Sequence, residues 1–220
     1  ECHVACGRCR LEACDGAAMQ DMTRSAPVPD APRAAPAPGD GWRLDVGANR
    51  AARKYRTAEQ LRRIAWAAGR WLLVLSPRPF FGWRRAVLRL YGARVGRGAH
   101  VYPSTRIAMP WNLELGEDCA LGEDVYVYNL GRVCVERGAT LSYRAHVCAG
   151  THDLRDPAMP LQRPPVLISE SAWVGTDAFI GPGVTVGAAA IVGARAVVVR
   201  DVAPSTVVAG NPAREIGRRE

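Results

Sequence analysis

An aliphatic residue recurs at every sixth position of this sequence from Ile168 to Val198, without an exception. The series is Ile168, Val174, Ile180, Val186, Val192 and Val198. A period of six matches neither the 3.6-residue turn of a helix nor the two-residue alternation of a strand. It is typical of a hexapeptide β-helix, in which three short strands form one triangular coil and successive coils stack. We expect the aliphatic residue to fill the interior. We also expect the glycine that follows most of these residues to adopt turn dihedrals that a Cβ would forbid.

The repeat begins before this regular run and is interrupted once. Residues six apart are aliphatic from Val95 onward, and a two-residue slip resets the register at Leu115 and again at Val135. Residues 153–166 break the period with four prolines and with acidic and basic residues, and we expect them to form a loop outside the coil. The sequence therefore predicts roughly five coils of about 18 residues each.

The remaining segments differ from the repeat in composition. Residues 1–41 are predicted to be a disordered tail or a translation artefact, because they are rich in Pro, Ala and Gly and lack periodicity. Residues 42–92 are predicted to be a basic helical segment that caps the solenoid, with helices over 57–75 and 82–91. The solenoid itself is expected to span 93–209, and 210–220 to form a C-terminal tail.

Charge and cysteine usage suggest a location. From Arg50 to Arg106 there are 14 basic residues and one acidic residue, interleaved with tryptophans. That composition also suits a helix lying on anionic lipid, whereas no nucleic-acid-binding motif accompanies the charge. Seven cysteines, with no secretory signal and no apolar run of about 18–20 residues, favour a cytoplasmic protein. Four of them cluster near His3, but their spacing fits a zinc site poorly.

Several motifs resemble one family. Besides the repeat, they are Gly150-Thr151-His152-Asp153, Ala172-Trp173-Val174-Gly175 and Ala209-Gly210-Asn211-Pro212-Ala213. Together they resemble the hexapeptide-repeat acyltransferases over about residues 42–219, and most closely the acetyltransferases of colanic acid biosynthesis. The resemblance implies a left-handed parallel β-helix, an all-β solenoid that uses acetyl-CoA and no metal. It also implies O-acetylation of a sugar hydroxyl in an exopolysaccharide or capsule building block.

A histidine is the expected general base, since its ordinary pKa lies near 6.5 and the acceptor hydroxyl must lose a proton. Of the four histidines, only His152 stands where the coil opens into the loop, and it matches the base of the family. His146 is expected to be structural. Asp153 or a backbone carbonyl is expected to fix the tautomer of the His152 ring.

The resemblance also assigns the remaining site residues. Substrate-binding roles are implied for Asn129, Trp173 and Asp153, although an Asn at a corner also suits a left-handed turn. The implied coenzyme A-binding residues are Gly175, Thr176, Ala194, Arg200 and Arg214. Val199 departs from the family pattern, because many relatives carry a hydroxyl residue there.

Other functions remain open at this point. Serine or amino-sugar N-acetylation, a zinc hydratase like the γ-class carbonic anhydrases, and a non-catalytic scaffold all fit the same fold. The zinc hydratase is disfavoured because His100, His146 and His152 are not spaced by whole coils. As partners we expect two further copies in a homotrimer, a sugar or lipid-linked saccharide acceptor, and the cytoplasmic face of an anionic membrane.

Overall fold

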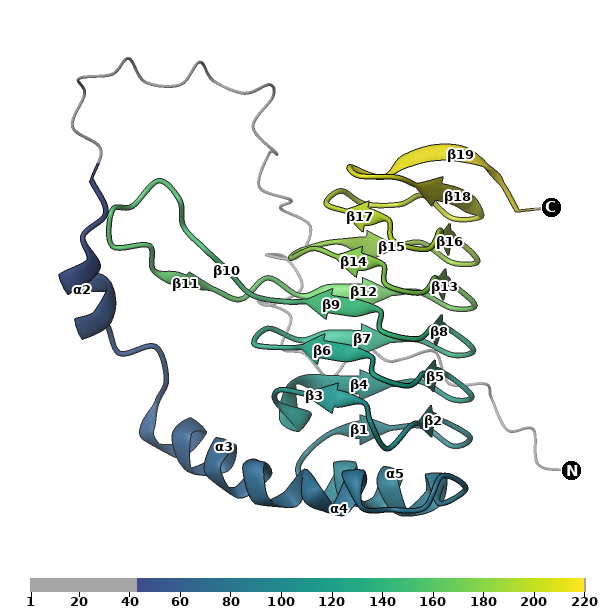
Figure 1. Cartoon of the computed structure of the whole chain (residues 1–220), viewed down its shortest axis with the longest axis horizontal. Coiled ribbons are helices and arrows are strands. Elements are labelled where there is room, and N and C mark those ends of the chain that lie inside the picture. Colours follow the sequence, from purple (N-terminus) through teal and green to yellow (C-terminus); the bar gives the residue numbers. More distant parts are fainter. Residues whose placement is uncertain (1–42, 220) are drawn as a thin grey trace, which may run out of the picture. The chain divides into compact units, whose positions relative to one another are not determined.

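The computed structural model describes residues 43–219, so the predicted tail and its cysteine–histidine cluster lie outside the described residues. From Asp45 onward the chain is one compact unit. It is a parallel β-solenoid preceded by helices, and the predicted fold class is confirmed (Figure 1). No helix among the described residues is long and apolar enough to cross a membrane.

Each coil contributes one short strand to each of three sheets. Sheet A contains β1 (Arg94–Val95), β4 (Leu113–Leu115), β7 (Val133–Val135), β12 (Val166–Ile168) and β15 (Thr185–Val186). Sheet B contains β2 (His100–Val101), β5 (Ala120–Leu121), β8 (Thr140–Leu141), β13 (Trp173–Val174), β16 (Ile191–Val192), β18 (Thr206–Ala209) and β19 (Arg214–Arg218). Sheet C contains β3 (Arg106–Ile107), β6 (Tyr126–Tyr128), β9 (His146–Cys148), β14 (Phe179–Ile180) and β17 (Val197–Val198).

The predicted aliphatic positions form the interior, and the structure explains the two-residue slips. Val186 pairs with Ile168 of the coil before it, 18 residues earlier, and both are buried. The strands β4, β7 and β12 of sheet A have three residues and bury both of their ends, as Leu113 and Leu115 do in β4. Val95 therefore pairs with Leu115, 20 residues later. The slips lengthen the early coils without breaking the stack.

The expected role of the repeat glycines is wrong in one respect. Gly175 and Gly187 do not have positive φ; the left-handed residue lies two positions later, at Asp177 and Ala189. The glycines are instead required by close packing. A Cβ on Gly187 would lie 2.6 Å from the Pro204 nitrogen of the adjoining turn, and one on Gly175 would lie 2.7 Å from a backbone oxygen. The repeat therefore needs glycine for contact between coils.

The helices α3 (Thr57–Gly69), α4 (Trp71–Val74) and α5 (Phe81–Leu90) lie across the N-terminal end of the solenoid (Figure 1). The predicted single helix over 57–75 is divided at Arg70. Trp66, Leu73 and Leu88 are buried in the same core cluster as the coils. Arg84 is fully buried and donates to the carbonyls of Val101, Pro77 and Arg78, which ties α5 to the first coil.

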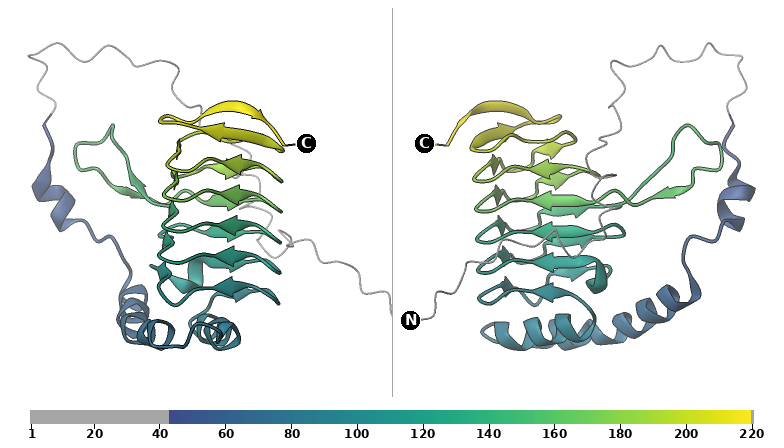
Figure 2. Two further views of the ribbon diagram at one scale, coloured as in Figure 1. Left: turned by 45° about the vertical axis from the view of Figure 1, so that its right-hand side comes forward. Right: turned by 180° about the vertical axis from the view of Figure 1, so that it is seen from behind.

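Two parts of the chain differ from the predicted boundaries. Residues 45–56, expected to belong to the cap, include the short helix α2 (Val46–Ala51) and lie beside a hairpin that projects from the stack (Figure 2). That hairpin is β10 (Thr151–His152) with β11 (Leu161–Gln162). The predicted C-terminal tail forms β19, which pairs antiparallel with β18. This pairing covers the exposed edge that sheet B would otherwise leave at the last coil.

Candidate active site

His152 lies on the projecting hairpin. After β9 the chain leaves sheet C, and β10 pairs antiparallel with β11 so that His152 lies opposite Leu161. The ring Nδ1 of His152 is 2.6 Å from the carbonyl oxygen of Met159 in the hairpin tip. A carbonyl oxygen only accepts hydrogen bonds, so Nδ1 carries a proton, and in the neutral ring Nε2 therefore has the lone pair. This is the tautomer that a general base acting through Nε2 requires.

Asp153 does not bind the His152 ring, although it is one of the two groups expected to fix the tautomer of that ring. Its Oδ1 accepts the backbone N–H of Arg155 at 2.9 Å, which closes the first turn of the loop. Of the two partners that the sequence left open for the imidazole, the backbone carbonyl is therefore the one present. Asp153 shapes the loop next to the base.

Asn129 is not placed as its predicted substrate role requires. Its side chain is fully buried, its Oδ1 accepts from the Met109 N–H at 2.9 Å, and its Nδ2 donates to the Met109 carbonyl at 2.6 Å. Both polar atoms of the amide thus bridge two successive coils. Nor is its φ positive, so the alternative of a left-handed turn does not apply. We correct the prediction: Asn129 joins two coils and presents no free amide atom to a ligand.

Trp173 does not meet His152 within one chain. Trp173 belongs to β13 of sheet B, is 51% exposed, and donates from its indole nitrogen to Ser142 Oγ at 2.7 Å. The hairpin that carries His152 leaves the solenoid at the corner between sheets C and A. Sheet B is the side opposite that corner, so a site that contains both residues needs a second copy of the chain.

The predicted coenzyme A residues form two groups. Gly175, Thr176 and Ala194 stack on successive coils where sheet B turns into sheet C; a Cβ on Gly175 would lie 2.8 Å from the Ala194 nitrogen. Arg200 and Arg214 line one cavity of about 330 Å³ at the C-terminal end of the solenoid. Val199, the departure from the family pattern, lines the same cavity.

His146 lies in an aromatic column on the outer face of sheet C. Its ring stacks on Tyr126 at 4.9 Å between centroids and meets the edge of Phe179 at 5.2 Å. Burial lowers the pKa of His146, and its Nε2 has no hydrogen-bond partner among the described residues. This environment suits a packed neutral imidazole.

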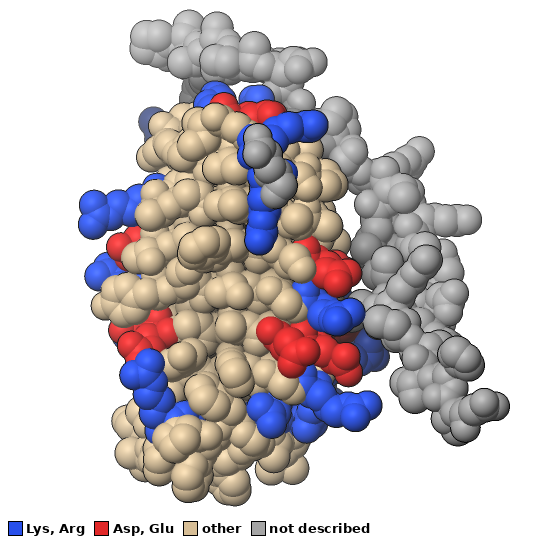
Figure 3. All heavy atoms as spheres, turned by 90° about the vertical axis from the view of Figure 1, so that its right-hand side faces the viewer, with Lys and Arg blue, Asp and Glu red and all other residues tan. Residues whose placement is uncertain are grey.

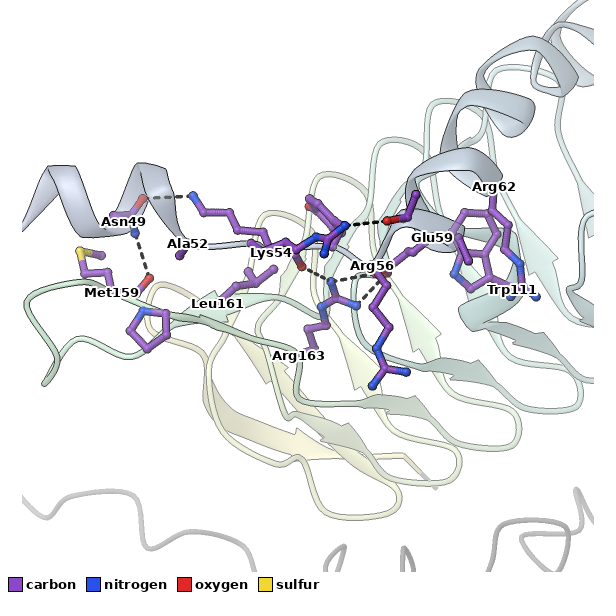
Figure 4. A pocket seen from close by; sticks show the side chains of 15 residues that line it. Asn49, Ala52, Lys54, Arg56, Glu59, Arg62, Trp111, Met159, Leu161 and Arg163 are labelled. Atoms are coloured by element: carbon purple, nitrogen blue, oxygen red, sulfur yellow. Dashed lines mark hydrogen bonds and ion pairs between the residues drawn. The ribbon is translucent and has the colours of Figure 1, made fainter.

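Two cavities flank the N-terminal segment, and sequence reasoning found neither. The larger, about 880 Å³, lies between residues 49–62 and the hairpin (Figure 4). The other, about 660 Å³, lies between α3 and the outer face of sheet C. Its polar lining includes three arginines and three tyrosines: Arg63, Arg70, Arg106, Tyr55, Tyr126 and Tyr128. Short non-periodic segments such as 45–56 give no sequence signal for such contacts.

Among residues 43–219 no group of three or more His, Cys, Asp or Glu side chains is placed to hold a metal ion. His100 packs against Phe81 at 4.4 Å between ring centroids, on the side of the solenoid away from His152.

The chain is similar to known acetyltransferases. No protein-family model matches it. It is 36% identical, over 154 residues, to the protein of Escherichia coli K12 described as "Putative colanic acid biosynthesis acetyltransferase WcaF"; the match covers 70% of this chain and 85% of that protein. Two solved structures share the fold at a TM-score of 0.70. One is galactoside acetyltransferase in complex with coenzyme A, at 20% identity over 76% of this chain and 86% of the other. The second is a hexapeptide-repeat-containing acetyltransferase of Vibrio cholerae complexed with acetyl coenzyme A, at 22% identity over 76% and 92%.

Proposed function

The chain belongs to the hexapeptide-repeat acetyltransferases, and from that membership we propose that it moves acetyl from acetyl-CoA to a saccharide hydroxyl. The acceptor in this proposal is a building block of an exopolysaccharide or capsule, as the name of the similar E. coli protein suggests. The observation that carries the proposal is the hydrogen bond between His152 Nδ1 and the Met159 carbonyl, which leaves Nε2 free to accept a proton.

The reaction needs one group that removes the proton of the acceptor hydroxyl and later delivers it to the thiolate sulfur. His152 Nε2 takes the proton of the acceptor hydroxyl as that oxygen forms its bond to the acetyl carbon. The same nitrogen then gives the proton to the departing sulfur, so the products are an acetyl ester and a free thiol. Acetyl-CoA supplies the activated thioester in this scheme. The Met159 carbonyl stabilises the imidazolium that exists between the two transfers.

The residues at the coil corner suit a pantetheine arm, and those at the C-terminal end suit phosphates. Gly175, Thr176 and Ala194 have small side chains at which a thin ligand reaches the backbone. Arg200 and Arg214 line one cavity, and planar guanidinium groups bind phosphate oxygens in pairs.

An anionic acceptor suits the groove beside α3. Arg63, Arg70 and Arg106 line it, and none of them has an acidic partner among the described residues. Tyr126 and Tyr128 beside them add aromatic surface of the kind on which sugar rings pack, whereas the Tyr55 ring is covered by Arg63 and Arg163. A saccharide linked to a lipid through phosphate would satisfy both features of this groove.

The active unit in this proposal is a homotrimer with sites between subunits. The outward positions of the six parallel strands of sheet B, β19 excluded, carry no acidic or basic residue except the imidazole of His100: His100, Ala120, Thr140, Trp173, Ile191 and Val207. In Figure 3 the middle of this side is uncharged, with charged residues toward its edges. Such a surface is suited to burial against another copy, and burial there would bring Trp173 close to a neighbouring hairpin.

The decisive experiment compares the wild type with His152→Ala. Purified protein is incubated with acetyl-CoA and a panel of neutral, nucleotide-linked and lipid-linked sugars, and acetylated products are identified by mass. We expect His152→Ala to lower kcat by about 10²–10⁴-fold. Retention of activity within about tenfold would overturn the assignment of the base. Serine and amino sugars belong in the panel. A preference for serine or for a sugar amine would replace the proposed acceptor, a saccharide hydroxyl.

A further inference from the structure

The short helix α2 is held to the catalytic hairpin almost entirely by polar contacts. Of its six residues only Asn49 is not exposed, and none is buried. Asp45 caps the helix by accepting the Ala48 N–H at 2.8 Å, and the Asp45 N–H donates to the Pro157 carbonyl at 2.9 Å. With no apolar side chain buried there, hydrogen bonds determine where α2 lies on the hairpin.

Asn49 reaches the carbonyl group that orients His152. Its Nδ2 donates to the Ala158 carbonyl at 2.6 Å and to the Met159 carbonyl at 3.1 Å (Figure 4). The Met159 oxygen is also the acceptor for His152 Nδ1. A carbonyl oxygen has two lone pairs, so it can hold both donors at once.

Two further contacts fix this arrangement. Lys54 Nζ donates to Asn49 Oδ1 at 3.1 Å, and because an ammonium group only donates, it sets which end of the amide faces the hairpin. Directly after β11, Arg163 forms an ion pair with Glu59 at 2.8 Å and donates to the Lys54 carbonyl at 2.8 Å. The hairpin is thus attached to the N-terminal segment at its tip and near its base.

We propose that Asn49 is a positioning residue for acetyl transfer: it fixes the Met159 carbonyl, which in turn keeps the proton of His152 on Nδ1 and the lone pair on Nε2. The inference rests on the proposed function of His152 as the base. Groups that hydrogen-bond directly to a metal-ligating histidine typically affect metal affinity or activity by about 10–100-fold, and we take that range as the scale for Asn49, which acts one group further away. Without Asn49, the Met159 carbonyl is free to turn toward water, and the ring loses its tautomer preference.

The test uses the full chain with the variants Asn49→Ala and Asn49→Asp. Asn49→Ala is expected to lower kcat by about 10–100-fold with the KM for acetyl-CoA nearly unchanged. Asn49→Asp is expected to be at least as impaired, because a carboxylate cannot donate to two carbonyls. Arg50→Ala is the matched control: Arg50 lies on the same helix, is exposed, and forms no side-chain hydrogen bond or ion pair with residues 43–219. It is expected to retain wild-type kcat.

The second readout is the tautomer itself, measured by ¹⁵N NMR of histidine-labelled protein and assigned with His152→Ala. We expect Nδ1–H in the wild type and a mixture of tautomers in Asn49→Ala. An unchanged tautomer in Asn49→Ala overturns the proposal, whether or not kcat falls. If His152→Ala is active, the assignment of His152 as the base fails, yet a tautomer change in Asn49→Ala still establishes that Asn49 orients the ring.

Discussion

At the scale of single residues, His152, Asn129 and Asn49 show which roles a sequence can assign and which it cannot. His152 was singled out by its place at the end of the periodic run, and the structure gives its ring a partner that sets the tautomer. Asn129 was misassigned, because an amide serves the backbone as well as it serves a ligand, and sequence does not show which. Asn49 gave no signal at all, since its importance depends on a contact 109 and 110 residues away.

His146 leads to a prediction about pH. Because burial lowers its pKa, the folded state binds a proton at this site less readily than the unfolded state does. Stability should therefore fall as the pH drops through the ordinary histidine pKa of about 6.5. His146→Phe, which keeps the aromatic column, should lose less stability between pH 7.5 and 5.5 in urea unfolding. Equal losses in both proteins would show that His146 does not contribute.

At the scale of elements, the six-residue recurrence of aliphatic residues predicted the strands of the coils, because packing in the interior requires an inward aliphatic residue on each strand. The longer strands of sheet A and the break at Arg70 were not predicted, since both depend on how neighbouring elements meet. The β10–β11 hairpin was expected only as a loop. Its pairing is short and contains no alternating pattern, so nothing local indicates a strand.

The glycine positions allow a matched comparison. Gly187→Ala should lower the free energy of unfolding by about 1–3 kcal/mol, because its Cβ would be forced against the Pro204 nitrogen of the adjoining turn. Gly217→Ala should be nearly neutral, since a Cβ at Gly217 has nothing within 4 Å. Thermal and urea unfolding of the two variants measure the difference. Equal effects would mean that close packing is not why the repeat needs glycine.

At the scale of the whole molecule, the uncharged side of sheet B predicts the assembly. A charge placed in it, Ile191→Arg, should dissociate the proposed trimer, because a guanidinium would be buried without a partner. Ala188→Arg, at an exposed corner, is the control. Light scattering and acetyl transfer are measured together, and activity should be lost along with the trimer. A fully active wild-type monomer would contradict the shared site.

The helical end of the molecule predicts contact with lipid. Trp66 is buried against the first coils, whereas Ile64 of α3 is 68% exposed and Leu75, directly after α4, is 77% exposed. Other large apolar residues exposed on this end are Leu61, Trp71, Leu72, Phe80, Trp83 and Leu90. We expect the protein to float with anionic vesicles at low salt and to be released at high salt, since each basic residue near the surface contributes about 1 kcal/mol. Sedimentation without the vesicles at low salt would leave the helices a purely structural role.

The stack is continuous across the β10–β11 hairpin. Val166 of β12 pairs directly with Val133 of β7, so the coils before and after the hairpin join as though no residues lay between them. The free energy of closing a flexible loop grows only with the logarithm of its length. Hairpins of other lengths and sequences can therefore be exchanged at this seam with little cost to the scaffold. In evolution, and in the laboratory, the segment that carries His152 is then free to change while the folding of the solenoid stays under separate selection.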